Sequence, residues 1–189
     1  MIGYAFCGSF CTMSLSLASL KRLLELGEEI QPIFSENAYS TDTRFHRAAD
    51  FVKEVESLCA RKAIHSIPEA EPLGPKTPLD SLIIAPCTGN TVAKIASGIT
   101  DTSVTMAAKA HLRQDRPLLI ALATNDGMSQ NLSNIATLLG RKSVYLLPMR
   151  QDDPKGKPHS LVAEMELLPD AFCAMKEKKQ LRPIFLLPK

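Results

Sequence analysis

The stretch that decides the fold is Leu79-Asp-Ser-Leu-Ile-Ile-Ala-Pro-Cys-Thr-Gly-Asn-Thr91, a short apolar run that ends abruptly in a polar turn. A continuous apolar run of this length is typical of a strand that is covered on both faces. After the turn, residues 91 to 97 and then 104 to 112 have the spacing of helices. This part of the chain therefore predicts a buried strand, a polar loop and helices that return over the sheet.

The same alternation extends outward in both directions. Buried strands are predicted at residues 2–7, 29–34, 117–123 and 143–147. Helices are predicted around residues 17–24, 43–60, 131–139 and 161–178. Such alternation specifies an α/β fold, a Rossmann-like or flavodoxin-like doubly wound domain with a parallel sheet and helices on both faces. We expect one domain over residues 1–189, with 151–189 forming a C-terminal loop, a helix and an edge strand or arm.

Several shorter segments carry local predictions. Residues 35–38 are polar and are expected to form a loop, and the four prolines in residues 66–78 predict an ordered excursion or flap. Asp101, Thr102 and Ser103 are expected to cap the helix that follows them. His46 is expected to be solvated on the polar side of its helix, and His111 is expected to favour the dipole at its helix end.

The composition excludes several classes of function. A net charge of +2 is too small to indicate nucleic acid or an anionic membrane as a partner. The five cysteines have neither CxxC pairs nor metal-ligand spacing, so we expect reduced thiols and no metal site. No apolar run approaches the length of a membrane span. A cytoplasmic protein that binds a small molecule or another protein is expected.

The loop after the first strand, Gly8-Ser-Phe-Cys-Thr12, is small, and Gly8 can adopt conformations that bring backbone amides close to an anion. It therefore suits a phosphate, although an ordinary strand-to-helix turn explains the same residues equally well. It is neither a GxGxxG nor a GxxxxGK[ST] sequence, so NAD and ATP are disfavoured as its ligand.

The loop after the third strand is more specific. Residues 85–91 place a proline, a glycine and several hydroxyl or amide side chains between a buried strand and a helix, enough to line a flat polar heterocycle. A capping segment with Thr88 or Asn90 as N-cap is the alternative, but it accounts for one residue only. Cys11 and Cys87 lie in these two loops, where small thiols more often fill space than react.

Residues 85–101 resemble the PASANT-type motif of the homo-oligomeric flavin-containing cysteine decarboxylase superfamily, and residues 8, 9 and 35 match its phosphate loops. Within this superfamily the chain is similar to the family of dipicolinate synthase flavoprotein subunits. The blocks that carry the second resemblance are residues 37–45, 70–76, 104–110, 125–126 and 151–154.

The resemblance implies a site for FMN, held weakly or replaced by NADP. The residues it assigns to this cofactor are Gly8, Ser9, Phe10, Cys11, Thr12, Ser35, Asn37, Pro86, Cys87, Thr88, Gly89, Asn90, Thr91 and Thr105. Residues 8–11 and 35 would surround the phosphate, residues 86–91 would line the ring, and Thr105 would approach from the far side. Asn90 and Asn125 would face the substrate.

Two departures from the superfamily pattern bear on the reaction. The decarboxylases place a catalytic histidine shortly before the PASANT strand, whereas here His65 is separated from Pro86 by the proline-rich excursion. Their PxMNxxM motif is replaced by residues 123–128, which retain only Asn125 and Met128. Cysteine decarboxylation is therefore not the expected reaction, and no residue is identified as a catalytic base.

The narrower family implies oxidation of dihydrodipicolinate to dipicolinate (pyridine-2,6-dicarboxylate) in the sporulating mother cell. It also implies a partner, the synthase's A-subunit, which resembles NAD(P)-binding dehydrogenases, and self-association as trimers or their multiples. A dicarboxylate substrate needs cations; Lys76 and Lys157 are candidates, and an exposed basic loop is the alternative. A flavin-dependent decarboxylase, a prenyl-flavin-type transferase and a non-catalytic assembly role remain open.

Overall fold

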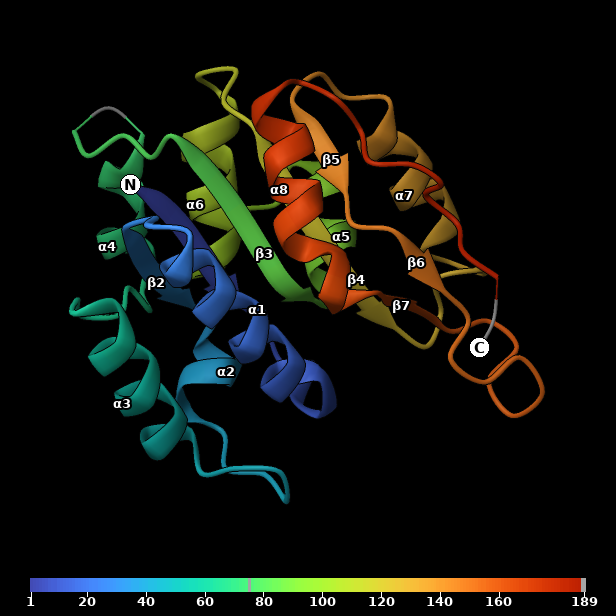
Figure 1. Cartoon of the computed structure of the whole chain (residues 1–189), viewed down its shortest axis with the longest axis horizontal. Coiled ribbons are helices and arrows are strands. Elements are labelled where there is room, and N and C mark those ends of the chain that lie inside the picture. The colour runs from blue at the N-terminus through green and yellow to red at the C-terminus, as the bar shows by residue number, and fades with distance from the viewer. Residues whose placement is uncertain (75, 188–189) are drawn as a thin grey trace.

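A parallel sheet forms the centre of the computed structural model, which describes residues 1–74 and 76–187 (Figure 1). Its strands lie side by side in the order β2-β1-β3-β4-β5. Their bounds are Ile2–Phe6 (β1), Ile30–Phe34 (β2), Ser81–Cys87 (β3), Leu118–Thr124 (β4) and Val144–Leu146 (β5). The order reverses between β1 and β3, as in flavodoxin-like folds. The predicted fold class is confirmed.

Two short strands, β7 and β6, continue the sheet beyond β4, and β7 runs opposite to its neighbours on both sides. Strand β5 pairs with the first half of β4, and β7 (Leu161–Ala163) pairs antiparallel with Ala123 and Thr124 at its end. Strand β6 (Met149–Arg150) then pairs with β7. The prediction of a helix from residue 161 was therefore wrong at its start, because the helix α8 spans only Leu168–Lys176 after a 3-10 turn, Met165–Leu167.

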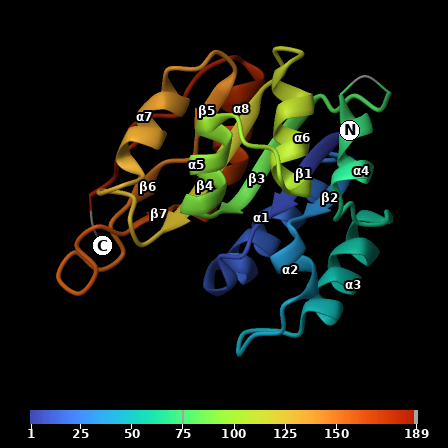
Figure 2. The same ribbon diagram turned by 180° about the vertical axis from the view of Figure 1, so that it is seen from behind.

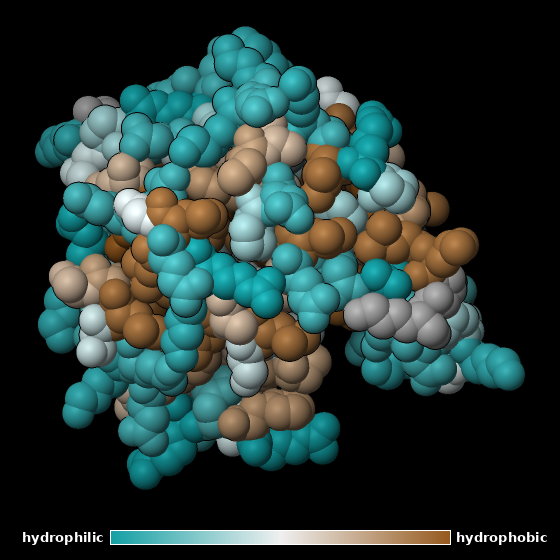
Figure 3. Space-filling view, in the orientation of Figure 1, coloured by the Kyte–Doolittle hydropathy of each residue, from teal (hydrophilic) through white to brown (hydrophobic). Residues whose placement is uncertain are grey.

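The loop between β6 and β7 projects from the molecule, and the surface is hollowed between it and the rest of the chain (Figure 3). In the C-terminal segment, Phe185 forms an isolated bridge with Met149, which agrees with an edge-strand position. Residues 188–189 of the predicted arm, and residue 75 of the proline-rich excursion, lie outside the described residues.

Helices cover both faces of the sheet (Figures 1 and 2). One face carries α1 (Met13–Glu25), α3 (Ala48–Cys59) and α8. The other carries α4 (Ile67–Ala70), α5 (Gly89–Ser97), α6 (Ser103–Leu112) and α7 (Leu132–Leu139). Alternate residues of β1 divide between the two cores, since Tyr4 and Phe6 pack with α1 whereas Ala5 and Cys7 pack with α5 and α6.

The segments after β2 differ from the prediction. Residues 36–40 form a short helix, α2 (Glu36–Ser40), because Ser35 caps it by accepting a hydrogen bond from the amide of Ala38 at 3.3 Å. Helix α3 begins at Ala48 rather than at residue 43, so Phe45 lies outside the helix and is 49% exposed.

Two histidines also differ from their predicted environments. His46 is half-buried, with its ring centroid 4.8 Å from that of Phe51, and is not solvated. His111 is fully buried, and its Nε2 lies 2.9 Å from the carbonyl oxygen of Pro117. Because burial lowers the pKa of His111, we conclude that the ring is neutral and offers the helix dipole no charge.

The proline-rich excursion is ordered where it is described. Pro68 and Pro72 occupy first-turn positions in α4 and in a 3-10 turn, Glu71–Leu73, where the backbone N–H that proline lacks would have no partner within the helix. Ala70 and Leu73 are buried in the core shared with α6. The excursion therefore packs on the body of the protein.

Candidate functional site

Two adjoining cavities open at the carboxyl ends of the strands, at the point where the strand order reverses. The β2-side cavity has a volume of about 600 Å³. It is lined by Cys7, Gly8, Phe10, Ser35, Glu36, Asn37, Thr41, Thr88, Asn90, Thr91, Lys94, Asp101 and Thr102. Crevices at such switch points are the usual ligand sites of open α/β sheets.

The β4-side cavity has a volume of about 590 Å³ and opens beside β4. It is lined by Gly8, Ser9, Phe10, Cys11, Arg44, Phe45, Thr88, Gly89, Asn90, Ala123, Thr124, Asn125 and Asp126. Gly8, Phe10, Thr88 and Asn90 line both cavities. The turn after β1 and the turn after β3 therefore converge, as the sequence predicted.

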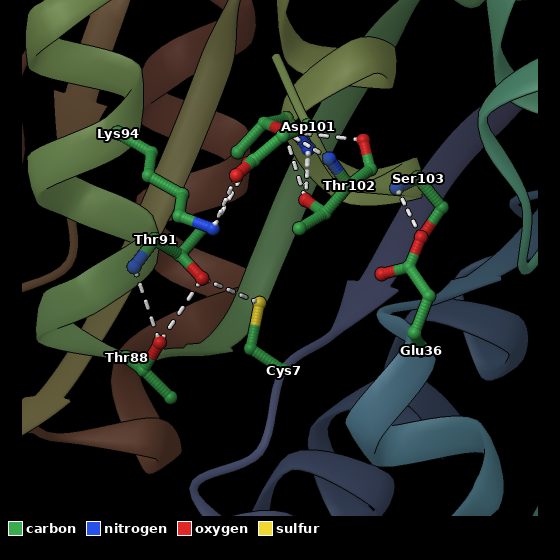
Figure 4. A network of polar contacts seen from close by, with 9 residues as sticks. Cys7, Glu36, Thr88, Thr91, Lys94, Asp101, Thr102 and Ser103 are labelled. Atoms are coloured by element: carbon green, nitrogen blue, oxygen red, sulfur yellow. Dashed lines mark hydrogen bonds and ion pairs between the residues drawn. The ribbon is translucent and has the colours of Figure 1, made fainter. Parts of the chain in front are cut away.

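Hydrogen bonds beneath the cavities hold these two turns together (Figure 4). The amide of Cys7 donates to the carbonyl oxygen of Pro86 at 3.1 Å, and the hydroxyl of Thr91 donates to the sulfur of Cys7 at 3.4 Å. Thr88 caps α5 by accepting from the amide of Thr91 at 3.2 Å. Cys87 is fully buried beside Cys7, and burial raises its pKa, so this thiol fills space as expected.

The charged groups of the β2-side cavity have partners within the protein (Figure 4). Lys94 forms an ion pair with Asp101 at 2.9 Å, and its hydrogen bond lowers the pKa of that carboxyl group. Glu36 accepts a hydrogen bond from the amide of Ser103 at 3.0 Å. Thr102 caps α6 through reciprocal bonds with Thr105, which confirms the predicted cap. The donors left for a ligand are mainly neutral.

Asp126 is the centre of a polar cluster at the end of β4. Asn131 donates to both carboxylate oxygens at 2.9 Å, and the hydroxyl of Thr124 also donates to this group. These hydrogen bonds lower the pKa of Asp126, and the bond from Thr124 has the largest effect. Gly89 packs against the cluster so closely that a Cβ on it would lie 2.5 Å from Asn131 Nδ2 and from Thr124 Oγ1.

The conformational freedom of Gly8 is not what its position requires. Gly8 does not have a positive φ, and an added Cβ would meet Phe10 and Asn37 at 3.5–3.8 Å, which is ordinary contact. Its small size leaves space in both cavities.

Most of the residues assigned to the cofactor line one or both cavities. Those that do are Gly8, Ser9, Phe10, Cys11, Ser35, Asn37, Thr88, Gly89, Asn90 and Thr91. Thr12 instead donates to the carbonyl oxygen of Ser9, while Pro86 and Cys87 continue β3. Thr105 is buried at the start of α6 and lines neither of the two cavities. None of these four residues lines either cavity.

The residues assigned to the substrate divide in the same way. Asn90 and Asn125 line the β4-side cavity. Lys76 lies in the excursion before β3, at the amino ends of the strands, and its amide bonds to Pro72. Lys157 forms an ion pair with Asp152 at 3.0 Å and lines neither cavity. Within this chain, Lys76 is thus separate from the polar turns, whereas Lys157 interacts electrostatically with Cys11 of the turn after β1.

His65 is also outside both cavities. Its ring stacks on Tyr39 with centroids 3.9 Å apart, and its Nε2 lies 4.0 Å from Glu69. Five charged residues and Phe45 contribute to the cavities without having been predicted from the sequence. They are Glu36, Arg44, Phe45, Lys94, Asp101 and Asp126. The signal that could have found some of them is that Arg44, Phe45 and Asp126 lie within the blocks that carried the family resemblance.

Comparisons with known proteins agree on one family. The model of the flavoprotein family matches residues 2–166. The dipicolinate synthase B-subunit of Bacillus subtilis strain 168 is 43% identical over 185 residues, which are 98% of this chain and 92% of that protein. In the ranges that the structure describes, no helix is long and apolar enough to cross a membrane.

Solved structures show the same relation. The crystal structure of the dipicolinate synthase B-subunit from Bacillus halodurans superposes with a TM-score of 0.90 at 38% identity, covering 98% of this chain and 95% of the other. A dodecameric FMN-dependent UbiX-like decarboxylase from Escherichia coli O157:H7 has a TM-score of 0.62 at 23% identity, covering 78% and 80% of the two chains. The second likeness shows the fold alone.

Proposed function

The chain belongs to the flavoprotein family and groups with dipicolinate synthase B-subunits, and from this premise we propose that it contributes an FMN-type site to the oxidation of dihydrodipicolinate to dipicolinate. The observation that carries the proposal is the pair of cavities that share Gly8, Phe10, Thr88 and Asn90. One cavity can hold a phosphate-bearing cofactor while the other holds a small substrate beside it.

The residues of the β2-side cavity fit FMN. They combine small and neutral polar side chains, among them Ser35, Asn37 and Thr88. These lie in a crevice at the ends of the strands, where they can donate hydrogen bonds to a phosphate and to a flat ring. FMN, when bound, supplies a flat two-electron acceptor. The chain's own part is to bind the phosphate near Gly8 and Ser35, to orient the ring against residues 88–91, and to exclude water with Phe10.

The β4-side cavity is the proposed place of the substrate. Dihydrodipicolinate loses two hydrogens, one as hydride and one as a proton, and the ring becomes aromatic. The hydride acceptor would be the flavin or an NADP bound by the A-subunit of the synthase. Asn90 and Asn125 line this cavity, and their side-chain amides would hold the substrate. Because aromatisation drives the reaction, no strong base is required.

The proposal includes partners and a location. The dehydrogenase-like A-subunit of dipicolinate synthase is the proposed partner and the carrier of part of the hydride chemistry. Self-association is supported by the dodecameric relative from Escherichia coli. The cytoplasm of the sporulating mother cell is the proposed compartment. A flavin-dependent decarboxylase is disfavoured by the position of His65, which lines neither cavity.

The test is to purify the chain with and without the A-subunit, to release any bound chromophore and to identify it by mass spectrometry. Dipicolinate formation by the complex is then compared for the wild type, Gly8→Asp and Asn90→Ala. Gly8→Asp adds a negative charge where the phosphate is proposed, whereas the control Gly8→Ala adds only a methyl group in ordinary contact. We expect loss of flavin and product with Gly8→Asp and retention with Gly8→Ala.

Two outcomes would contradict the proposal. Full dipicolinate formation by both Gly8→Asp and Asn90→Ala, with no flavin in any sample, would indicate a non-catalytic assembly role. Turnover of a peptidyl-cysteine or pantothenoyl-cysteine substrate by this chain on its own would indicate a decarboxylase.

A further inference from the structure

The loop between α2 and α3 brings a cation to the β4-side cavity. Arg44 lies in this loop, which is held by its own hydrogen bonds. The carboxylate of Asp42 accepts from the amide of Ala48 at 2.8 Å, and the hydroxyl of Thr43 accepts from the amide of Phe45 at 3.2 Å. The loop that carries Arg44 is therefore held by hydrogen bonds within the chain.

The same loop is anchored to the wall of the site. The ring of His46 lies between those of Phe51, at 4.8 Å, and Phe10, at 6.1 Å, as measured between centroids. Phe10 lines both cavities, and Phe51 belongs to the core beneath α3. Arg44 is thus fixed relative to the turn after β1 although its own side chain is exposed.

The two charged residues that line the β4-side cavity differ in the partners they have within the protein. Arg44 is the only cation and Asp126 the only anion among the lining residues. The oxygens of Asp126 already accept from Thr124 and Asn131. Over residues 1–74 and 76–187, Arg44 forms no salt bridge, and its guanidinium lies 4.9 Å from the centroid of the Phe45 ring. Among the described residues, the cavity lining therefore has one positive charge without a salt bridge and one negative charge that is already hydrogen-bonded.

We propose that Arg44 binds one carboxylate of the dicarboxylate substrate and so determines its specificity and orientation. This inference rests on the proposed function. A guanidinium donates two parallel hydrogen bonds to a carboxylate, and its stacking on Phe45 reduces the freedom it loses on binding. Asp126 repels a carboxylate, so the substrate is turned with one carboxylate toward Arg44 and the other toward the amide of Asn90.

The experiment measures binding of dipicolinate and of its neutral isostere, pyridine-2,6-dicarboxamide, by calorimetry. The wild type, Arg44→Gln, Arg44→Lys and Arg47→Gln are each used alone and in complex with the A-subunit. Arg47 is a matched control because it is an exposed arginine of the same loop that does not line the cavity. Thermal unfolding of each variant checks that the fold is retained.

We expect Arg44→Gln to weaken dipicolinate binding by about 10- to 100-fold, the usual effect of a charge-assisted hydrogen bond. Binding of the diamide should not change, Arg44→Lys should recover part of the affinity, and Arg47→Gln should match the wild type. Wild-type dipicolinate affinity in Arg44→Gln would overturn this inference and leave the proposed function standing. Failure of the wild type to bind dipicolinate, alone and in the complex, would overturn both.

Discussion

The two cavities share a wall but differ in how their charges are used. In the β2-side cavity, Lys94 is paired with Asp101 and Glu36 accepts from the amide of Ser103. In the β4-side cavity, Asp126 is satisfied by its neighbours whereas Arg44 forms no salt bridge with any described residue. A cavity whose charges are paired internally suits a ligand held by neutral donors, and a cavity with a free cation suits an anion.

Gly89 joins the two regions, and its replacement should have the largest effect. In Gly89→Ala the new Cβ would lie 2.5 Å from Asn131 Nδ2 and Thr124 Oγ1 and 2.9 Å from Asp126 Oδ1. The turn after β3 and the end of β4 must then move apart, at a cost of about 1–3 kcal/mol in the free energy of unfolding. Denaturant unfolding measures the stability, and titrations with dipicolinate and FMN measure the two cavities.

We expect the β4-side cavity to lose affinity for dipicolinate more than the β2-side cavity loses affinity for FMN. Gly140→Ala is the control, because its Cβ would meet nothing closer than 3.6 Å and its φ of −77° suits alanine. Unchanged stability in Gly89→Ala would mean that the cluster around Asp126 yields easily and does not shape the cavity.

Asp126 should have the next largest effect. Asp126→Ala leaves the amide of Asn131, which is 4% exposed, without its carboxylate acceptor, and this should cost about 1–3 kcal/mol of unfolding free energy. Asn134→Ala is a matched control, since it removes another partner of Asn131 without touching the carboxylate. Equal losses of unfolding free energy in the two variants would show that Asp126 contributes no more to stability than Asn134 does.

The pH dependence of stability follows from the same residue. Because hydrogen bonds lower the pKa of folded Asp126, its contribution is fully present above the unfolded pKa of about 3.9 and is lost as the pH falls through the folded value. The difference in unfolding free energy between the wild type and Asp126→Ala should therefore shrink below about pH 4. A difference that stays constant down to acid pH would contradict an ionised Asp126.

The sequence predicted the parallel sheet and the converging turns because these depend on local signals. Buried strands such as β3 are continuous apolar runs, and Thr88 and Thr102 are residues that commonly cap helices. The role of Arg44 could not be predicted, since Phe45 continues the helical spacing of α3. In the folded chain, the amides of Ala48 and Phe45 donate hydrogen bonds to the side chains of Asp42 and Thr43. These bonds stabilise a loop before Ala48 in place of a longer helix.

The pairing of β7 and the position of Lys76 could not be predicted from the sequence for a different reason. Strand β7 has only three residues and is defined by its contact with the end of β4, which is a tertiary interaction. Lys76 carries the right charge, but the end of the sheet on which it lies is set by the path of the excursion. Residue type can suggest a ligand's partner, whereas topology decides whether that residue reaches the site.

The smallest expected effect comes from giving the β2-side cavity an unpaired cation, as the β4-side cavity has in Arg44. Asp101→Asn removes the partner of Lys94 and leaves a free cation beside the proposed phosphate position, so FMN affinity should rise by a few-fold, as expected for a partly exposed charge. Fluorescence titration with FMN measures the change. Asp115→Asn is the matched control, because it releases Lys142 from an exposed pair that lines neither of the two cavities. Weaker FMN binding in Asp101→Asn would instead mean that Lys94 contributes to binding only when the ion pair with Asp101 fixes its position. The paired charges would then position the ligand rather than merely cancel one another.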